Sequence, residues 1–87
     1  MISTNVEVGT TRVQLLSPSN SWRTVYIHVI GNTPVYLGGA DVTTANGLLT
    51  EKHTSPIELY IPAEEELWAV AASTVEVRLM KPLNHVD

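Results

Sequence analysis

Residues 67–80 read LWAVAASTVEVRLM, and this stretch decides the fold class. Its first half, Leu67 to Ala72, is almost wholly apolar, as expected for a strand that is covered on both faces. After a tight turn at Ser73-Thr74, apolar and polar residues alternate from Val75 to Met80, which is the period of a half-buried strand. The stretch therefore predicts two consecutive β-strands.

The same period of two recurs through the rest of the chain and predicts further strands. They are expected at Thr11–Leu16, Arg23–Ile30, Val35–Leu37 and Ile57–Ile61. Neither face of Arg23–Ile30 is strongly polar, which is typical of a central strand or of a strand at an interface. Pro56 and Pro62 bracket the last of these strands, and proline is tolerated at strand starts and at sheet edges.

Turn residues separate these strands at short intervals. Gly31 to Pro34 predicts a turn, with a hairpin from the preceding strand into Val35–Leu37. Leu48 to Ser55 is mixed in character and is expected to be a loop. About six or seven short antiparallel strands, without any sustained helical period, predict an all-β fold that is either a compact β-sandwich or a small barrel.

Length and composition indicate one domain, part of whose surface is covered by partners. The chain has 87 residues, which is enough for a single domain. We predict a β-domain over residues 1–87 with its core at about 11–80, a flexible N-terminal arm at 1–5 and a flexible tail at 81–87. Charged residues make up 16% of the chain, below the usual ~25%, while 44% is hydrophobic. Part of the surface is therefore expected to contact partners, most simply other copies of the chain.

Charge and cysteine content exclude several classes of function. The formal net charge is -4 with five Lys plus Arg, so neither a nucleic-acid interface nor a basic membrane patch is expected. The absence of cysteine indicates folding in a reducing compartment and excludes thiolate zinc sites. Met1 to Thr10 lacks the features of a signal peptide, and no apolar run approaches the ~20 residues of a membrane span.

The chain offers no arrangement of residues that is typical of an enzyme. His28, His53 and His85 lack the spacing of metal ligands, and no serine lies in a Gly-x-Ser-x-Gly elbow. Glu64 to Glu66 is expected to be a solvated acidic turn. Gly38-Gly39 lacks the Lys-Ser/Thr of a phosphate loop. We therefore predict no catalytic residue, no metal and no cofactor.

The large amphipathic side chains are the best candidates for contacting a partner. The candidate interface residues are Trp22, Tyr26, Tyr60, Trp68 and Met80. Tryptophan and tyrosine without phenylalanine are also typical of a platform on which sugars stack. Tyr60 and Trp68 fit an interface and a packed core equally well, so both interpretations stay open for them.

Two segments resemble small all-β virion structural proteins of tailed bacteriophages. The first is Val35 to Gly47, VYLGGADVTTANG, in which a Val-Tyr-Leu-Gly-Gly strand end precedes an Asp-Val-Thr turn. The second is Leu67 to Ser73, LWAVAAS, which resembles the closing strand of that family. The resemblance covers roughly residues 24 to 80, and it departs between Leu48 and Ser55, where the family often has a short proline-containing loop.

The resemblance implies a capsid decoration protein or a head-fibre base. Such a protein is made in the bacterial cytoplasm, joins the virion and stabilises the outer surface of the head by binding the major capsid protein. It also implies a homo-oligomer, preferably a homotrimer at threefold positions of the shell. The alternative is a tail- or fibre-associated module that binds carbohydrate during host recognition.

Overall fold

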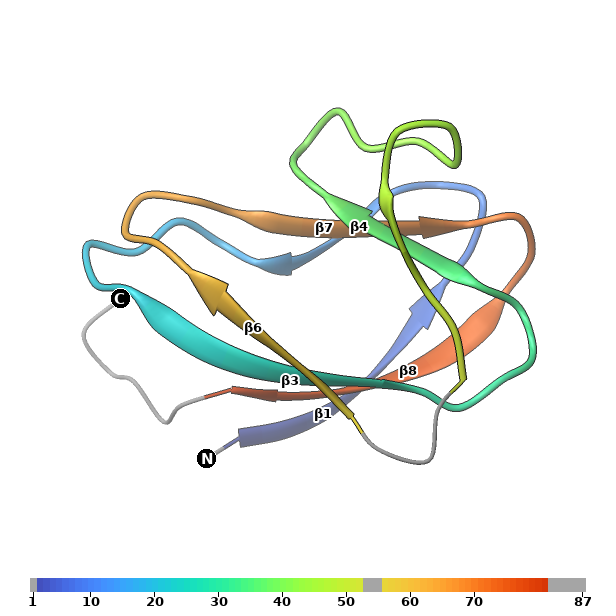
Figure 1. Ribbon diagram of the computed structural model, residues 1–87, viewed down its shortest axis with the longest axis horizontal. Coiled ribbons are helices and arrows are strands. Elements are labelled where there is room, and N and C mark those ends of the chain that lie inside the picture. Colours follow the sequence, from blue (N-terminus) through green and yellow to red (C-terminus); the bar gives the residue numbers. More distant parts are fainter. Residues whose placement is uncertain (1, 53–55, 82–87) are drawn as a thin grey trace.

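The computed structural model describes residues 2–52 and 56–81. These residues form two antiparallel four-stranded sheets that face each other as layers (Figure 1). Sheet A has the order β1-β8-β3-β6, and sheet B has the order β2-β7-β4-β5. The strands are β1 (Ile2–Val8), β2 (Val13–Leu16), β3 (Arg23–Val29), β4 (Val35–Gly38), β5 (Leu48–Thr50), β6 (Ile57–Ile61), β7 (Leu67–Ala71) and β8 (Val75–Lys81). The predicted all-β fold is confirmed, and of the two predicted forms it is the sandwich; the described residues form eight strands in place of six or seven.

The core lies between the sheets and is built from every second residue of the central strands. Val25 and Ile27 of β3 and Val77 of β8 are at most 1% exposed. The opposite sheet contributes Leu67, Ala69 and Ala71 of β7 to the same cluster. The alternation predicted for these strands is therefore the alternation between core and outer surface, and β3 is central in its sheet as expected.

The N-terminal residues differ from the prediction of a flexible arm at 1–5. Residues Ile2 to Asn5 belong to β1, which pairs with β8 in one continuous register from Ile2 opposite Lys81 to Val8 opposite Val75. The sequence did not predict this strand because Ser3, Thr4 and Asn5 are polar. An edge strand needs few apolar side chains, so its pattern is weak. The core thus begins before residue 11. Residue 81 ends β8, and the remainder of the predicted tail lies outside the described residues.

The predicted hairpin at Gly31 to Pro34 is wrong, because this turn connects the two sheets. It leads from β3 in sheet A to β4 in sheet B, and Ser73-Thr74 makes the corresponding crossing between β7 and β8. The two crossings meet through a hydrogen bond between the hydroxyls of Thr33 and Ser73 at 3.1 Å. Turn residues predict a reversal of the chain, but they do not say which strand becomes the neighbour.

The predicted loop at Leu48 to Ser55 contains strand β5, which is also a correction. Leu48 to Thr50 pairs with Leu37 to Val35 of β4 at the edge of sheet B. Leu48 and Leu49 are both exposed, so this segment lacks the alternation that marks a half-buried strand. Residues 53–55 lie outside the described part of the chain.

Candidate functional site

Four of the five candidate interface residues lie together on the outer face of sheet A. Tyr26 of β3 lies directly opposite Met80 of β8. Tyr60 of β6 lies opposite Thr24, which is two residues before Tyr26 on the same face of β3. The ring of Tyr60 contacts the ring of Trp22. These four side chains follow a diagonal across the sheet from Met80 on β8, through Tyr26 on β3, to Tyr60 on β6 and its ring partner Trp22, which directly precedes β3. We call Trp22, Tyr60, Tyr26 and Met80 the aromatic band.

The outer end of the aromatic band is an exposed pair of rings. The ring centroids of Trp22 and Tyr60 lie 5.4 Å apart, and their planes are tilted by 32°. The two residues are 60% and 61% exposed, so they pack against each other and not into the core. Exposed apolar groups that adjoin one another are typical of an interaction surface, because isolated ones are common but contiguous ones are not. For Tyr60, the core interpretation is wrong.

Trp68 lies on the other side of the molecule, apart from the aromatic band. It is on the outer face of sheet B, half-buried, and outside the core cluster. Its indole Nε1–H donates a hydrogen bond to Glu66 Oε1 at 2.8 Å, and Gln14 Nε2 donates to the same oxygen at 2.9 Å. Glu66 therefore joins β2 to β7, and this member of the acidic turn is bonded within the chain. The indole N–H of Trp68 therefore already has a hydrogen-bond partner within the chain.

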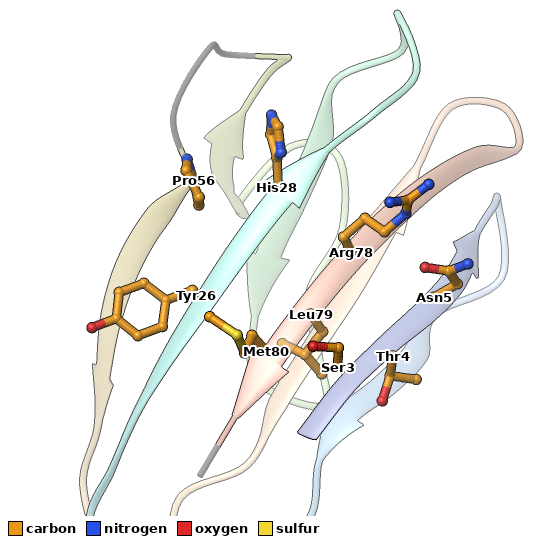
Figure 2. Close-up of a pocket in the computed structure, with 9 residues that line it drawn as sticks. All are labelled: Ser3, Thr4, Asn5, Tyr26, His28, Pro56, Arg78, Leu79 and Met80. Atoms are coloured by element: carbon orange, nitrogen blue, oxygen red, sulfur yellow. The ribbon is translucent and has the colours of Figure 1, made fainter. Parts of the chain in front are cut away.

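An open hollow of about 440 Å³ adjoins the inner end of the aromatic band (Figure 2). It lies over β1, β8, β3 and the start of β6. Its lining residues are Ser3, Thr4, Asn5, Tyr26, His28, Pro56, Arg78, Leu79 and Met80. Met80 and Pro56 form apolar parts of the wall, while Asn5, His28 and Arg78 add polar groups at one end. A hollow of this mixed character can accept side chains from a protein partner.

A salt bridge and a hydrogen bond to a carboxylate lie on this face. Arg78 Nε donates to Glu76 Oε2 at 3.0 Å, so the guanidinium beside the hollow has a carboxylate partner on its own strand. Tyr26 Oη donates to Glu58 Oε2 at 3.0 Å across the β3–β6 pair. This hydrogen bond, the charge of the carboxylate and partial desolvation together raise the pKa of Tyr26 above its ordinary value of 10.0.

The contact between Tyr26 and Glu58 predicts a dependence on pH. Glu58→Gln should lower the pKa of Tyr26 toward 10.0, measured by the absorbance of tyrosinate during alkaline titration. Because the folded-state pKa is raised, the contact stabilises the fold fully below the unfolded-state pKa and is lost as the pH rises through the folded-state pKa. Tyr26→Phe removes the signal and identifies it. An unchanged titration in Glu58→Gln contradicts the assignment.

The described residues contain no group of three His, Asp or Glu side chains placed to hold a metal ion. Of the three histidines, His28 lines the hollow, whereas His53 and His85 lie outside the described residues. No helix in the described part of the chain is long and apolar enough to cross a membrane. No family model matches the chain, and comparisons with curated proteins and with solved structures also find no match.

The sequence did not single out Ser3, Asn5, Glu58 or Arg78 as parts of this face. Period two does place Arg78 with Met80, and Tyr26 with His28, on common faces of their strands. The missing information is the strand order. Strands β1, β8, β3 and β6 are neighbours in the sheet although they are far apart in the sequence.

Proposed function

We propose that this protein is a virion structural protein that decorates the outer surface of a bacteriophage head. The proposal starts from the resemblance of Val35 to Gly47 and of Leu67 to Ser73 to small β-proteins of tailed phages. Both segments occupy structural positions here: the first forms β4 and the turn after it, and the second forms β7. These two segments bear on the fold alone. Support for a decoration role therefore has to come from the surface of the molecule.

The observation that carries the proposal is the aromatic band. Trp22 and Tyr60 expose most of their surface, and Met80 is 37% exposed on the same face. Large side chains of this kind dominate the energy of protein interfaces when a partner covers them. An exposed face of this type suits attachment to a larger protein surface, and it needs no catalytic residue, metal or cofactor.

The partners that we propose are the major capsid protein and other copies of the chain. The folded domain is small, and binding of the folded form stabilises it by mass action. The resemblance favours a homotrimer at threefold positions of the shell. Synthesis in the bacterial cytoplasm and residence in the virion belong to the same proposal, and they agree with the absence of cysteine.

Binding to capsids tests the proposal directly. We expect the chain to be found in particles purified from the strain that encodes it and to co-sediment with capsids that lack it. The double variant Trp22→Ala/Tyr60→Ala should bind those capsids at least about tenfold more weakly, since removing an interface aromatic costs about 2 kcal/mol. Leu49→Ser, on the other sheet, is the matched control and should bind normally. Absence of the chain from particles overturns the proposal.

The Trp22–Tyr60 pair also favours a second candidate, a tail- or fibre-associated module that binds carbohydrate. Exposed rings stack on the apolar faces of sugars, although Trp68 lies too far round the molecule to extend the pair into a row. A glycan array separates the candidates. Glycan binding that disappears in Trp22→Ala, without binding to capsids, favours host recognition, and an array without any binding eliminates it.

A further inference from the structure

The free edges of the two sheets are protected to different degrees. Strand β6 is flanked by Pro56 and Pro62, and β5 has only three residues. Strand β2 has four residues and a register shift between Gln14 and Leu16. Prolines, bulges and short strands all oppose the addition of a strand from another molecule. Three of the four edges are therefore poorly suited to pairing.

The fourth edge, β1, lacks these features. It runs for seven residues from Ile2 to Val8, and it contains no proline, lysine or arginine. Its register with β8 is continuous along its whole length. Among the described residues, β1 is paired on its β8 side alone. The backbone groups on the other side of a long, regular strand form a template for another strand.

We propose that this edge binds β1 of a second copy of the chain, antiparallel and related by a twofold axis through Asn5. In this register all seven residues of the strand are paired. The acidic residue Glu7 then faces Ser3 of the second copy, so no like charges lie opposite each other. Ile2 faces Val8 of the second copy, which joins the apolar inner faces of the two sheets. The strand is thus complementary to itself.

Apolar burial favours this occupant over an unrelated peptide. Ile2 lies on the same face of β1 as Val8 and is 37% exposed, and Val6 packs against the core while only partly buried. A second β1 covers both side chains and joins the two A sheets into one sheet. A contact through one edge strand belongs with the small, reversible interfaces, so we expect a dimer that dissociates on dilution. It rests on the proposed self-assembly, and crowding of copies on a shell strengthens it.

Charge-swapped variants at the twofold axis test the contact and its register. Asn5→Lys and Asn5→Asp each place like charges opposite each other, and each should weaken self-association about fivefold at low salt. An equimolar mixture of the two variants should recover association, because the introduced lysine of one chain then faces the introduced aspartate of the other. Sedimentation of the isolated protein over a concentration series is the measurement. Leu49→Lys places the same charge on the β5 edge and should leave association unchanged.

The outcomes are distinct. A mass that rises toward twice that of the chain, with the loss and recovery described, supports the twofold contact. A monomer at every concentration overturns it. So does association of any order, a trimer included, that Asn5→Lys does not alter. Association with an extended peptide from a capsid protein at β1, without self-association, also overturns the second copy as occupant. Since these measurements use isolated protein, their failure leaves the capsid-binding experiment to test the virion role separately.

Discussion

Replacing Arg23 with methionine is expected to lower the free energy of unfolding by about 3 kcal/mol. Arg23 is only 3% exposed, at the start of β3. Its Nη1 donates a hydrogen bond to the carbonyl of Ser17 at 2.8 Å, and its Nη2 donates to the carbonyl of Glu65 at 3.0 Å. The side chain thus joins the loop before β3 to the turn between β6 and β7. Methionine fills much of the space but leaves both carbonyls without this donor.

The expected loss is smaller than the sum of the two hydrogen bonds. Hydrogen bonds to charged groups contribute about 1.5–3 kcal/mol each, but burying a guanidinium is costly, and methionine removes that cost. Arg23 Nε, moreover, has no hydrogen-bond partner among the described residues. Ser19 also accepts a backbone hydrogen bond from Glu64, whose φ of 69° is otherwise unfavourable, so the same two segments are joined twice. Loss of Arg23 weakens the arrangement that keeps Glu64 in this conformation.

Urea unfolding of Arg23→Met, Arg23→Lys and Arg12→Met measures this effect. Lysine should fall between arginine and methionine, because one ammonium group cannot satisfy both carbonyls in the planar geometry of a guanidinium. Arg12 is the matched control: it donates to the carbonyl of Ala40 at 2.8 Å but is exposed, so its replacement should cost within about 0.5 kcal/mol. Equal stability of Arg23→Met and the unaltered protein would show that packing and the Ser19–Glu64 backbone hydrogen bond hold the two segments without Arg23.

Arg23 also illustrates what the sequence could predict. Period two placed Val25, Ile27 and Val29 on one face of a strand, and the structure confirms that this face is the core. By the same alternation Arg23 belongs to this face. A charged side chain at a strand end can also point into solvent, so periodicity alone does not predict that Arg23 is buried. Its burial depends on two carbonyls that other segments supply.

The candidate surface was predictable to the same extent. The types of side chain selected Trp22, Tyr26, Tyr60 and Met80, and these residues do share one face. Residue type also selected Trp68, which lies on the other sheet. Which side chains lie next to each other in a sandwich depends on which strands pair. Here the paired strands are far apart in sequence, as in β1 with β8. Short turns were misleading, because the connections β1–β2, β3–β4, β6–β7 and β7–β8 all cross between the sheets.

Gly47→Ala is the second substitution with a large expected effect, a loss of about 2–3 kcal/mol. The turn from Gly39 to Gly47 folds back against sheet B, and its Val42 is only 2% exposed. A Cβ added at Gly47 would lie 2.6 Å from Tyr36 Cβ and 2.8 Å from Val42 Cγ2. The first neighbour is attached directly to the backbone of β4, so it cannot rotate away. The turn must therefore shift from the sheet or lose its own hydrogen bonds.

Those hydrogen bonds make the turn a rigid unit. Gly47 N–H donates to the carbonyl of Thr43 at 2.9 Å, and Asn46 Oδ1 accepts a hydrogen bond from the Thr43 backbone N–H at 2.8 Å. A shift at Gly47 is therefore transmitted to Thr43 and to the neighbouring Val42, which covers the outer face of the sheet. The penalty arises from close approach and not from φ, because the described glycines all lack a positive φ.

Gly39→Ala is the matched control within the same turn. A Cβ there meets only Asp41 Oδ1, at 3.6 Å, which is ordinary van der Waals contact. This variant should be neutral or more stable by about 0.5 kcal/mol, since alanine restricts the unfolded chain. Urea unfolding should therefore separate the two alanine variants by at least about 2 kcal/mol. Equal stabilities would mean that the turn does not pack on β4, and Val-Tyr-Leu-Gly-Gly would then end a strand without fixing the segment that follows it.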